Sequence, residues 1–260
     1  MMGDDIFIEN YYFVTVVFMW FLHVGFMCYE AGVSRRKNVM STAVKNIMTI
    51  AVVTPAFYYA GWWTYFCMSQ GFIPTIGDAI HGGECTMTLP WSELSGPNIG
   101  DHVMAVFWAA FLLFSWTTAS IVSGAVIERI KTSAFLIFAV IIGSFTWILD
   151  AAWGWHPGGW MVQILGYHDA YASGVVHAIA GGSALAIVKV LGPRIVKFGP
   201  NGEVRTIKPH NPWLVTIGLF LIFTGFWGFY AACNAPILDL SGDGTFFSAT
   251  SIYLMPTTLS

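Results

Sequence analysis

The basic residues of this chain are confined to three connectors, and long apolar runs separate those connectors. They are Arg35, Arg36, Lys37 and Lys45 in the first, Arg129 and Lys131 in the second, and Lys189, Arg194, Lys197, Arg205 and Lys208 in the third. A helix needs about 20 predominantly apolar residues to cross a bilayer, and the runs are long enough. Because basic residues concentrate in cytoplasmic loops, the pattern predicts a polytopic membrane protein with its basic connectors in the cytoplasm.

The composition excludes several other classes of protein. Hydrophobic residues make up 56% of the chain and charged residues 10%, whereas a soluble domain carries about 25% charged residues. The basic residues lie in separate loops and not in one stripe, so we expect no nucleic-acid partner. The four cysteines show no CxxC spacing, so we expect no metal site of the zinc-knuckle kind. The acidic N-terminus lacks the basic region of a signal peptide, so the first apolar run is expected to remain as a helix.

Six membrane spans and a short terminal segment are predicted, all in one transmembrane domain over residues 1–260. The spans lie near 10–33, 43–68, 102–128, 132–153, 168–191 and 213–234, and the terminal segment covers 246–260. The basic connectors follow the first, third and fifth spans. This order places the N-terminus outside the cell. We expect an all-α integral membrane protein, located in the plasma membrane. The terminal segment is too short to cross, so it is either interfacial or the beginning of a seventh helix.

The long connector from Gly71 to Gly100 contains no lysine or arginine, which indicates an external loop. Cys67 and Cys85 both fall toward that side. A disulfide between them and two free thiols are equal alternatives.

Ionisable residues at the cytoplasmic ends of the spans are interpreted as anchors. Glu30 ends the first span and is expected to hold the following connector through Asn38, Lys45 or backbone amides. Glu128 and Arg129 are expected to perform the same task after the third span.

The fifth span contains the most informative ionisable residues. Asp169 stands at its outer end, where a carboxylate can cap a helix, and His177 follows eight residues later. In a continuous helix this spacing places His177 roughly 12 Å deeper, near the middle of the membrane. A buried imidazole at that depth is costly, so packing and transport are equal alternatives for its role.

Aromatic residues gather near the outer end of this span. The loop from Trp153 to Trp160 is rich in tryptophan, which fits either an interfacial aromatic belt or a face that binds a small cation by cation–π attraction. Phe114 and Phe229 are two further aromatics on spans that could line a path.

These blocks, in their order and spacing, resemble the ammonium transporter / methylammonium permease / Rhesus (Amt/Mep/Rh) family over nearly the whole chain. The matching segments are Gly25-Phe26, Glu30-Ala31-Gly32, Arg36-Lys37-Asn38-Val39, Lys45-Asn46, Gly124-Ala125-Val126-Ile127-Glu128-Arg129 with Ser133-Ala134, Trp155 with Gly158-Gly159-Trp160, Asp169 with Gly174-Val175-Val176-His177, and Gly225-Phe226-Trp227-Gly228-Phe229. The resemblance implies ammonium/ammonia as the substrate of a transporter that is not an enzyme and needs no cofactor. It also implies a homotrimer in the lipid bilayer, with one narrow apolar pore in each subunit.

The resemblance implies a substrate-binding role for six residues. Trp155 resembles the tryptophan of the outer ammonium site, and Cys233 stands where the family often has a serine that helps to hold the cation. Asp169 resembles the carboxylate that orders this site without touching the ion. Phe114 and Phe229 resemble the stacked pair that closes the vestibule, and His177 resembles the first of two pore histidines.

The sequence also departs from the family pattern. Where the family commonly has Gln-Pro-Gly in the first span, this chain has His23-Val24-Gly25. Where the family usually has Asp-Phe-Ala-Gly-Gly-Thr, residues 169–174 are Asp-Ala-Tyr-Ala-Ser-Gly. Tyr230 stands in place of an asparagine. The family fold has eleven helices in two inverted halves of five plus a last helix, and these residues cover the first half and one further helix. We therefore expect a longer chain or a partner chain to supply the missing helices and the second pore histidine.

Three alternatives to a transporter are considered. The first is an ammonium sensor of the same fold, and the second is a degenerate structural subunit of a membrane complex. The presence of Asp169, Trp155 and His177 disfavours the second, because lipid packing alone does not require them. The third, a membrane enzyme with a histidine metal site, is disfavoured because only His23 and His177 lie within spans.

Overall fold

The computed structural model describes residues 2–72, 85 and 92–233. Its helices are α1 (Met2–Val33), α2 (Val39–Cys67), α3 (His102–Ala125), α4 (Thr132–Ile141), α5 (Trp147–Gly154), α6 (Trp160–Leu165), α7 (Ile179–Leu191) and α8 (Pro212–Cys233). Two π-helical turns, Ile142–Thr146 and Ser173–Ala178, precede α5 and α7. Within the described ranges, the only β pairing is an isolated bridge between Phe198 and Val204.

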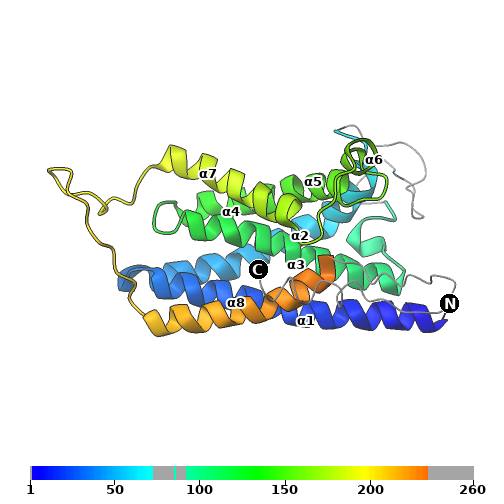
Figure 1. Cartoon of the computed structure of the whole chain (residues 1–260), viewed down its shortest axis with the longest axis horizontal. Helices are drawn as coiled ribbons and strands as arrows, with labels where there is room; N and C mark the ends of the chain where they lie inside the picture. The colour runs from blue at the N-terminus through cyan, green and yellow to red at the C-terminus, as the bar shows by residue number, and fades with distance from the viewer. Residues whose placement is uncertain (1, 73–84, 86–91, 234–260) are drawn as a thin grey trace.

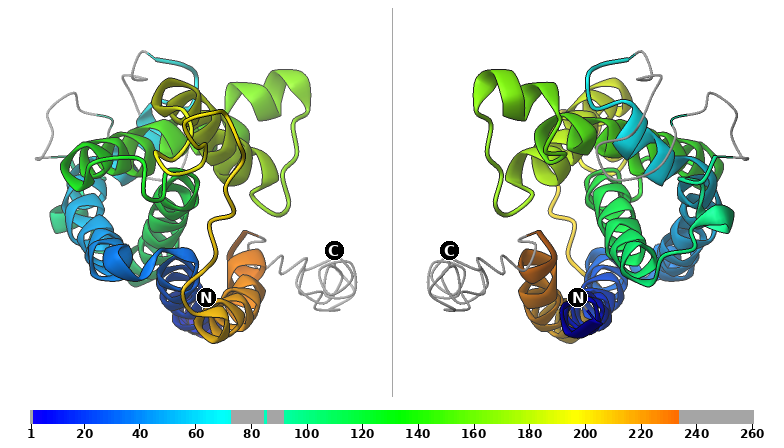
Figure 2. Two further views of the ribbon diagram at one scale, coloured as in Figure 1. Left: turned by 90° about the vertical axis from the view of Figure 1, so that its left-hand side faces the viewer. Right: turned by 90° about the vertical axis from the view of Figure 1, so that its right-hand side faces the viewer.

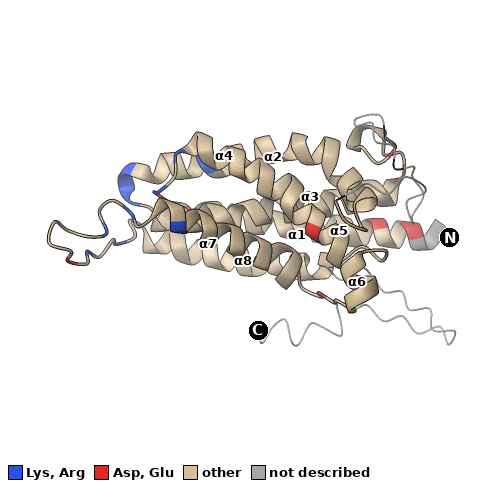
Figure 3. Cartoon of the chain, turned by 90° about the horizontal axis from the view of Figure 1, so that it is seen from above, with Lys and Arg blue, Asp and Glu red and all other residues tan. Residues whose placement is uncertain are grey.

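Six helical segments of the described chain are long and apolar enough to cross a membrane. They are Asp5–Val33, Arg36–Cys67, His102–Ala125, Thr132–Gly154, Ser173–Leu191 and Pro212–Cys233. The long helices run along a common direction (Figure 1), and the lysines and arginines gather at one end of the bundle (Figure 3). We call this the basic end, and the other the opposite end. The predicted all-α membrane class is confirmed, while the single domain stays a prediction.

Parts of the predicted chain lie outside the described residues. These are the terminal segment 246–260 and most of the connector between Gly71 and Gly100. Four predicted span boundaries differ from the helices of the structure. The helix α1 begins at Met2 and not near residue 10, and α2 begins at Val39 and not near residue 43. The third span was expected to reach residue 128, but α3 ends at Ala125, because the chain turns there and Glu128 adopts a left-handed φ of 58°. The fifth span was expected to begin at 168, but its helical backbone begins at Ser173.

Glycines allow α1 and α8 to pack closely along their length, and Figure 2 shows the two helices side by side. A Cβ atom added at Gly25 would stand 2.6 Å from the backbone nitrogen of Ile222, and one added at Gly218 would stand 2.5 Å from that of Tyr29. Small residues at such contacts are typical of membrane helices, because close backbone approach takes the place of a hydrophobic driving force. This packing fixes where α8 presents Phe229 and Cys233.

A disulfide joins Cys67, at the end of α2, to Cys85. Their Cα atoms are 5.5 Å apart, a normal separation for a disulfide. The structure thus settles the alternative that the sequence left open. In the described part of the chain, Cys28 and Cys233 are free thiols.

Two buried carboxylates join the connectors at the basic end. The Glu30 carboxylate lies 3.2 Å from Lys45 Nζ and accepts hydrogen bonds from Asn46 and Ser123, each at 2.9 Å. The expected anchor to Lys45 is therefore present, whereas Asn38 bonds to Glu128 at 2.8 Å and not to Glu30.

Glu128 links the first and third basic connectors. Its carboxylate accepts hydrogen bonds from the backbone amide of Arg35 at 2.8 Å and from Arg35 Nε at 2.9 Å, and it lies 3.7 Å from Arg194. Burial raises the pKa of this carboxyl, but the Arg35 amide, the Asn38 side chain and the charges of Arg35 and Arg194 outweigh burial. The net effect holds the pKa of Glu128 below its usual range.

Candidate functional site

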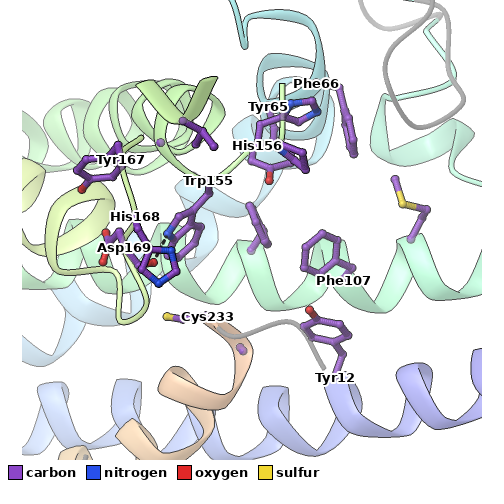
Figure 4. Close-up of a pocket in the computed structure, with 16 residues that line it drawn as sticks. Tyr12, Tyr65, Phe66, Phe107, Trp155, His156, Tyr167, His168, Asp169 and Cys233 are labelled. Atoms are coloured by element: carbon purple, nitrogen blue, oxygen red, sulfur yellow. Dashed lines mark hydrogen bonds between the residues drawn. The ribbon is translucent and has the colours of Figure 1, made fainter. Parts of the chain in front are cut away.

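A cavity of about 380 Å³ opens at the opposite end of the bundle. It lies between α1, α2, α3, the end of α8 and the loop that follows α5, and Figure 4 shows its walls. A water molecule occupies about 30 Å³ in the liquid, so the cavity has room for a small cation with several waters. Seven of its sixteen lining residues are Phe, Tyr or Trp, and the lining includes three of the predicted site residues: Trp155, Asp169 and Cys233.

Trp155 is held in the cavity wall by hydrogen bonds at both its backbone and its ring. It follows Gly154, the last residue of α5, and its backbone amide donates to the Ala151 carbonyl at 2.8 Å. Its indole Nε1 donates to the backbone carbonyl of Asp169 at 2.9 Å. The ring is half-buried and lies edge-on to Phe114, with centroids 5.3 Å apart. One aromatic face in a partly desolvated cavity is suited to a cation–π contact.

The Asp169 carboxylate is saturated by backbone amides. Its two oxygens accept from Tyr171, Ser173, Gly174 and Val175 at distances of 2.8 to 3.3 Å. The last three of these amides belong to the beginning of the helical segment, where free N–H groups favour a negative charge. The carboxylate therefore places a negative charge beside the cavity while its hydrogen-bonding positions are already occupied.

Tyr167, beside this carboxylate, has a shifted pKa. Burial, the charges of Asp169 and Asp150, and a hydrogen bond to Asp169 raise the pKa of Tyr167 to about 12. The phenol therefore stays neutral at physiological pH and leaves the negative charge to Asp169.

Asp169 and His177 do not lie on one continuous α-helix, contrary to the expectation from the sequence. Asp169 precedes the helix by four residues, and Ala172 turns the chain with a left-handed φ of 59° before a π-helical turn that contains His177. Such π turns occur frequently at functional sites. The expected depth of roughly 12 Å assumed one continuous α-helix, and the chain between the two residues does not form one.

His177 is oriented by the same turn. Its Nδ1 lies 3.0 Å from the Ala172 carbonyl oxygen. Since a carbonyl oxygen can only accept, Nδ1 carries the proton in this contact, and in the neutral ring the lone pair is on Nε2. The ring is half-buried and packs edge-on to Phe229 at 5.5 Å and nearly parallel to Phe226 at 6.0 Å.

Phe114 and Phe229 meet beneath Trp155, and neither is exposed. Their ring centroids are 4.6 Å apart, but the interplanar angle is 79°. The expected stacked pair is therefore an edge-to-face pair, which is also a favourable arrangement for aromatic rings. Through Phe114 and Phe229, a continuous series of ring contacts joins Trp155 to His177.

The structure brings the six predicted residues together from four segments of the chain. Cys233, at the end of α8, lines the same cavity as Trp155 and Asp169. His23 lies elsewhere, packed against Trp20 and Trp116. In the described residues, no group of three or more His, Cys, Asp or Glu side chains is arranged to hold a metal ion.

Sequence reasoning did not identify several residues of the cavity wall. Tyr12, Tyr65, Phe107 and His156 line it. The first three come from separate helices and belong to no recognisable motif. His156 follows Trp155 directly, and its Nδ1 accepts from the Gly158 amide at 3.0 Å. The tryptophan-rich loop was the one signal that could have indicated it.

Comparison with known proteins gives consistent sequence matches. A family model described as the Ammonium Transporter Family matches residues 10–258. The ammonium transporter Amt2 of Archaeoglobus fulgidus is 35% identical over 229 residues, which is 85% of this chain and 46% of that protein. The ammonium transporter of Bacillus subtilis is 33% identical over 234 residues, or 88% of this chain and 52% of that protein. The chain thus spans about half the length of the curated relatives that it matches.

Solved structures share the fold. A protein named Sensor Amt Protein superposes with a TM-score of 0.74 at 26% identity, over 90% of this chain and 56% of that one. Mep2 of Candida albicans superposes with a TM-score of 0.64 at 24% identity, over 87% of this chain and 48% of that one, a likeness that shows the fold alone.

Proposed function

This chain belongs to the ammonium transporter family, and from that premise we propose that it carries ammonium or ammonia selectively across a membrane. The observation that carries the proposal is the series of ring contacts from Trp155 through Phe114 and Phe229 to His177, beside the carboxylate of Asp169. It begins at an open aromatic cavity and passes two fully buried rings. Such a path can hold a small cation at its mouth and exclude hydrated ions further in.

The cavity supplies the first step, which is recognition of the cation. The Trp155 face attracts a positive charge, and Asp169 adds a negative potential without direct contact, since its oxygens are already bonded to amides. Ammonium and potassium are similar in size, so size does not separate them. Ammonium donates hydrogen bonds and potassium does not, so an acceptor such as Cys233 favours ammonium.

The buried phenyl pair supplies the second step, which is exclusion of the charged and hydrated form. In this proposal an N–H bond of ammonium breaks at Phe114 and Phe229, the electron pair stays on ammonia, and the proton passes toward the free nitrogen of His177. Ammonia and the proton then cross by way of the histidine. An apolar constriction penalises an intact hydrated ion because desolvation is uncompensated there.

The assembly is part of the same proposal. The basic end faces the cytoplasm and the N-terminus lies outside, in a plasma membrane, by the distribution of lysine and arginine. The working unit is a homotrimer with one pore in each subunit. A further segment or a partner chain supplies the remaining helices and a second pore histidine.

An ammonium sensor of the same fold is the second candidate. The structural likeness to the Sensor Amt Protein favours it. In this second candidate, binding of ammonium at Trp155 and Phe114 is read out and is not followed by transport. Binding of ammonium at Trp155 without uptake would identify this second function.

The test is uptake of labelled methylammonium into membrane vesicles that contain the protein as it exists in its own membrane. Wild-type vesicles are expected to accumulate the label, and His177→Ala to lose selective uptake. His102→Gln is the matched control, since His102 is exposed at the beginning of α3. Unchanged selective uptake in His177→Ala would contradict the proposed path.

A further inference from the structure

The cavity continues past Trp155 into a second group of aromatic residues. Tyr12 from α1, Tyr65 from α2, and Phe107 and Phe111 from α3 line this part, which we call the tyrosine subsite. In Figure 4, Tyr65 stands above the cavity, Phe107 at the side away from Trp155, and Tyr12 below. The tyrosine subsite is therefore open to the same space as Trp155, but it faces that space from other helices.

Ring contacts hold these four side chains in place. The centroids of Tyr12 and Phe107 are 4.9 Å apart, those of Phe107 and Phe111 are 4.7 Å apart, and those of Phe111 and Tyr65 are 4.9 Å apart. Phe111 also meets Trp155 at 5.8 Å. The subsite is thus a preformed aromatic wall that needs no rearrangement to receive a ligand.

The two hydroxyls of the subsite are its unusual feature. Tyr12 and Tyr65 are only 3% and 5% exposed, and both hydroxyl ends are directed into the cavity (Figure 4). The structure gives neither hydroxyl a hydrogen bond to any residue that it describes, whereas the neighbouring Tyr11 hydroxyl donates to the Ala231 carbonyl at 2.7 Å. A buried tyrosine hydroxyl usually finds a partner, so these two are available to a ligand in the cavity.

The chemistry of the wall defines the ligand. Aromatic faces bind methylated ammonium groups by cation–π attraction, and a phenolic oxygen accepts a hydrogen bond from N–H. The cavity of about 380 Å³ exceeds what ammonium fills. Phe114 and Phe229, which follow Trp155 in the series of ring contacts, are fully buried, and we expect them to stop a bulky cation.

We propose that Tyr12, Tyr65, Phe107 and Phe111 form a second cation subsite that binds alkylammonium ions carrying at least one N–H, and that bulky ions of this class, such as trimethylammonium, are held there without passage. The inference rests on the proposed function in taking an ammonium-type cation as the ligand. The subsite is separate from Trp155 and Cys233 in its residues, and its hydroxyl acceptors give it a preference for N–H over a fully methylated nitrogen.

Trimethylammonium and tetramethylammonium test this preference, because they share charge and shape but only the first has an N–H. The measurement is displacement of radiolabelled methylammonium from the protein isolated from its membrane with any accompanying subunits, at neutral pH. In the wild type, trimethylammonium is expected to bind about tenfold more tightly than tetramethylammonium. In Tyr12→Phe and Tyr65→Phe, the ratio should fall toward one through weaker trimethylammonium binding, with tetramethylammonium unchanged.

Matched controls make the result decisive. Tyr59→Phe changes a tyrosine of α2 that is 49% exposed and outside the cavity lining, and it should keep the wild-type ratio. Phe107→Leu removes a ring face and should weaken both ligands together. A wild-type ratio near one, or a ratio unchanged in both tyrosine variants, would overturn the proposal.

The experiments distinguish failure of the tyrosine subsite from failure of the proposed transport. Uptake by the wild type together with a ratio insensitive to both tyrosines would reject the subsite and leave transport intact. A ratio that falls in the tyrosine variants, in a protein without uptake, would retain the subsite and reject transport.

Discussion

Asp169 holds the indole of Trp155 with its backbone carbonyl and the beginning of the His177 segment with its side-chain carboxylate. The Asp169 backbone carbonyl accepts the indole N–H at 2.9 Å. Its carboxylate accepts the amide of Tyr171 and three amides at the beginning of the helical segment that contains His177. One residue thus fixes both the aromatic face at the cavity and the helix that presents the histidine. A change at Asp169 should therefore disturb both.

Asp169→Asn tests that relationship. An asparagine has one acceptor oxygen and an NH2 group that would face backbone N–H donors, so we expect a loss of about 2–4 kcal/mol of stability. Methylammonium uptake should fall more than tenfold because Trp155 and His177 lose their support. The measurements are thermal unfolding in detergent and uptake, with Glu203→Gln in the exposed third connector as the control. An unchanged melting temperature would show that the amides do not depend on the carboxylate.

Cys233 is expected to act as a weak hydrogen-bond acceptor for the cation. Sulfur accepts poorly compared with a hydroxyl oxygen, so Cys233→Ser should lower the ammonium concentration for half-maximal uptake by about two- to fivefold, and Cys233→Ala should raise it. The lining position also predicts that a charged, membrane-impermeant thiol reagent blocks uptake in a Cys28→Ala background. If serine and alanine behave alike, position 233 plays no part in holding the cation.

The depressed pKa of Glu128 predicts a loss of stability in acid. Its ionised form is favoured by the fold, so its contribution is fully present above the unfolded-state pKa of about 4.3 and is lost as pH falls through the lower folded value. Thermal unfolding of the wild type and Glu128→Gln, from neutral pH down to about pH 3, should show a gap that closes in acid. A gap that is constant with pH would exclude ionisation of Glu128 as its cause.

Substitutions of the buried Glu30 and Lys45 should have strongly non-additive effects on the free energy of unfolding. Lys45→Met leaves Glu30 without its cation, and Glu30→Gln leaves Lys45 Nζ with the Ser123 carbonyl at 3.0 Å and the ring of Phe135. Each single change is expected to cost about 3–5 kcal/mol, because it leaves one buried charge unpaired, and the double change less than the sum. A double-mutant cycle on unfolding measures this coupling.

The exposed pair of Glu203 and Arg205, also 3.0 Å apart, serves as the reference for that cycle. Exposed ion pairs contribute little, so its cycle should show almost no coupling. Additive costs at Glu30 and Lys45 would mean that the two charges do not stabilise one another.

The transmembrane character of the fold could be predicted because charge is segregated along the chain. Lysine and arginine lie in the connectors or near the ends of the apolar runs, and the six long apolar helices of the described residues follow that pattern. The beginning of the segment before α7 could not be predicted. Four amides of the 171–175 backbone close onto Asp169 there, and Ala172 adopts a left-handed φ that alanine rarely takes. Contacts with other parts of the fold determine the turn at Ala172, and the residue types in this segment do not predict it.

The candidate site was predictable where its residues are close in sequence or match a family motif. Trp155, Asp169 and His177 lie within one stretch, and their roles as a transport path stay a prediction. Tyr12, Tyr65 and Phe107 could not be identified, because aromatic residues are abundant on every span and only the packing of α1, α2 and α3 selects these three for the cavity.

Competition for uptake tests the central claim most directly. Liposomes containing the intact assembly are given labelled methylammonium with an excess of either ammonium or potassium. The account predicts accumulation that excess ammonium abolishes and excess potassium leaves unchanged, because only ammonium donates hydrogen bonds and can lose a proton at Phe114 and Phe229. Equal competition by potassium, or uptake no greater than in protein-free liposomes, would contradict it.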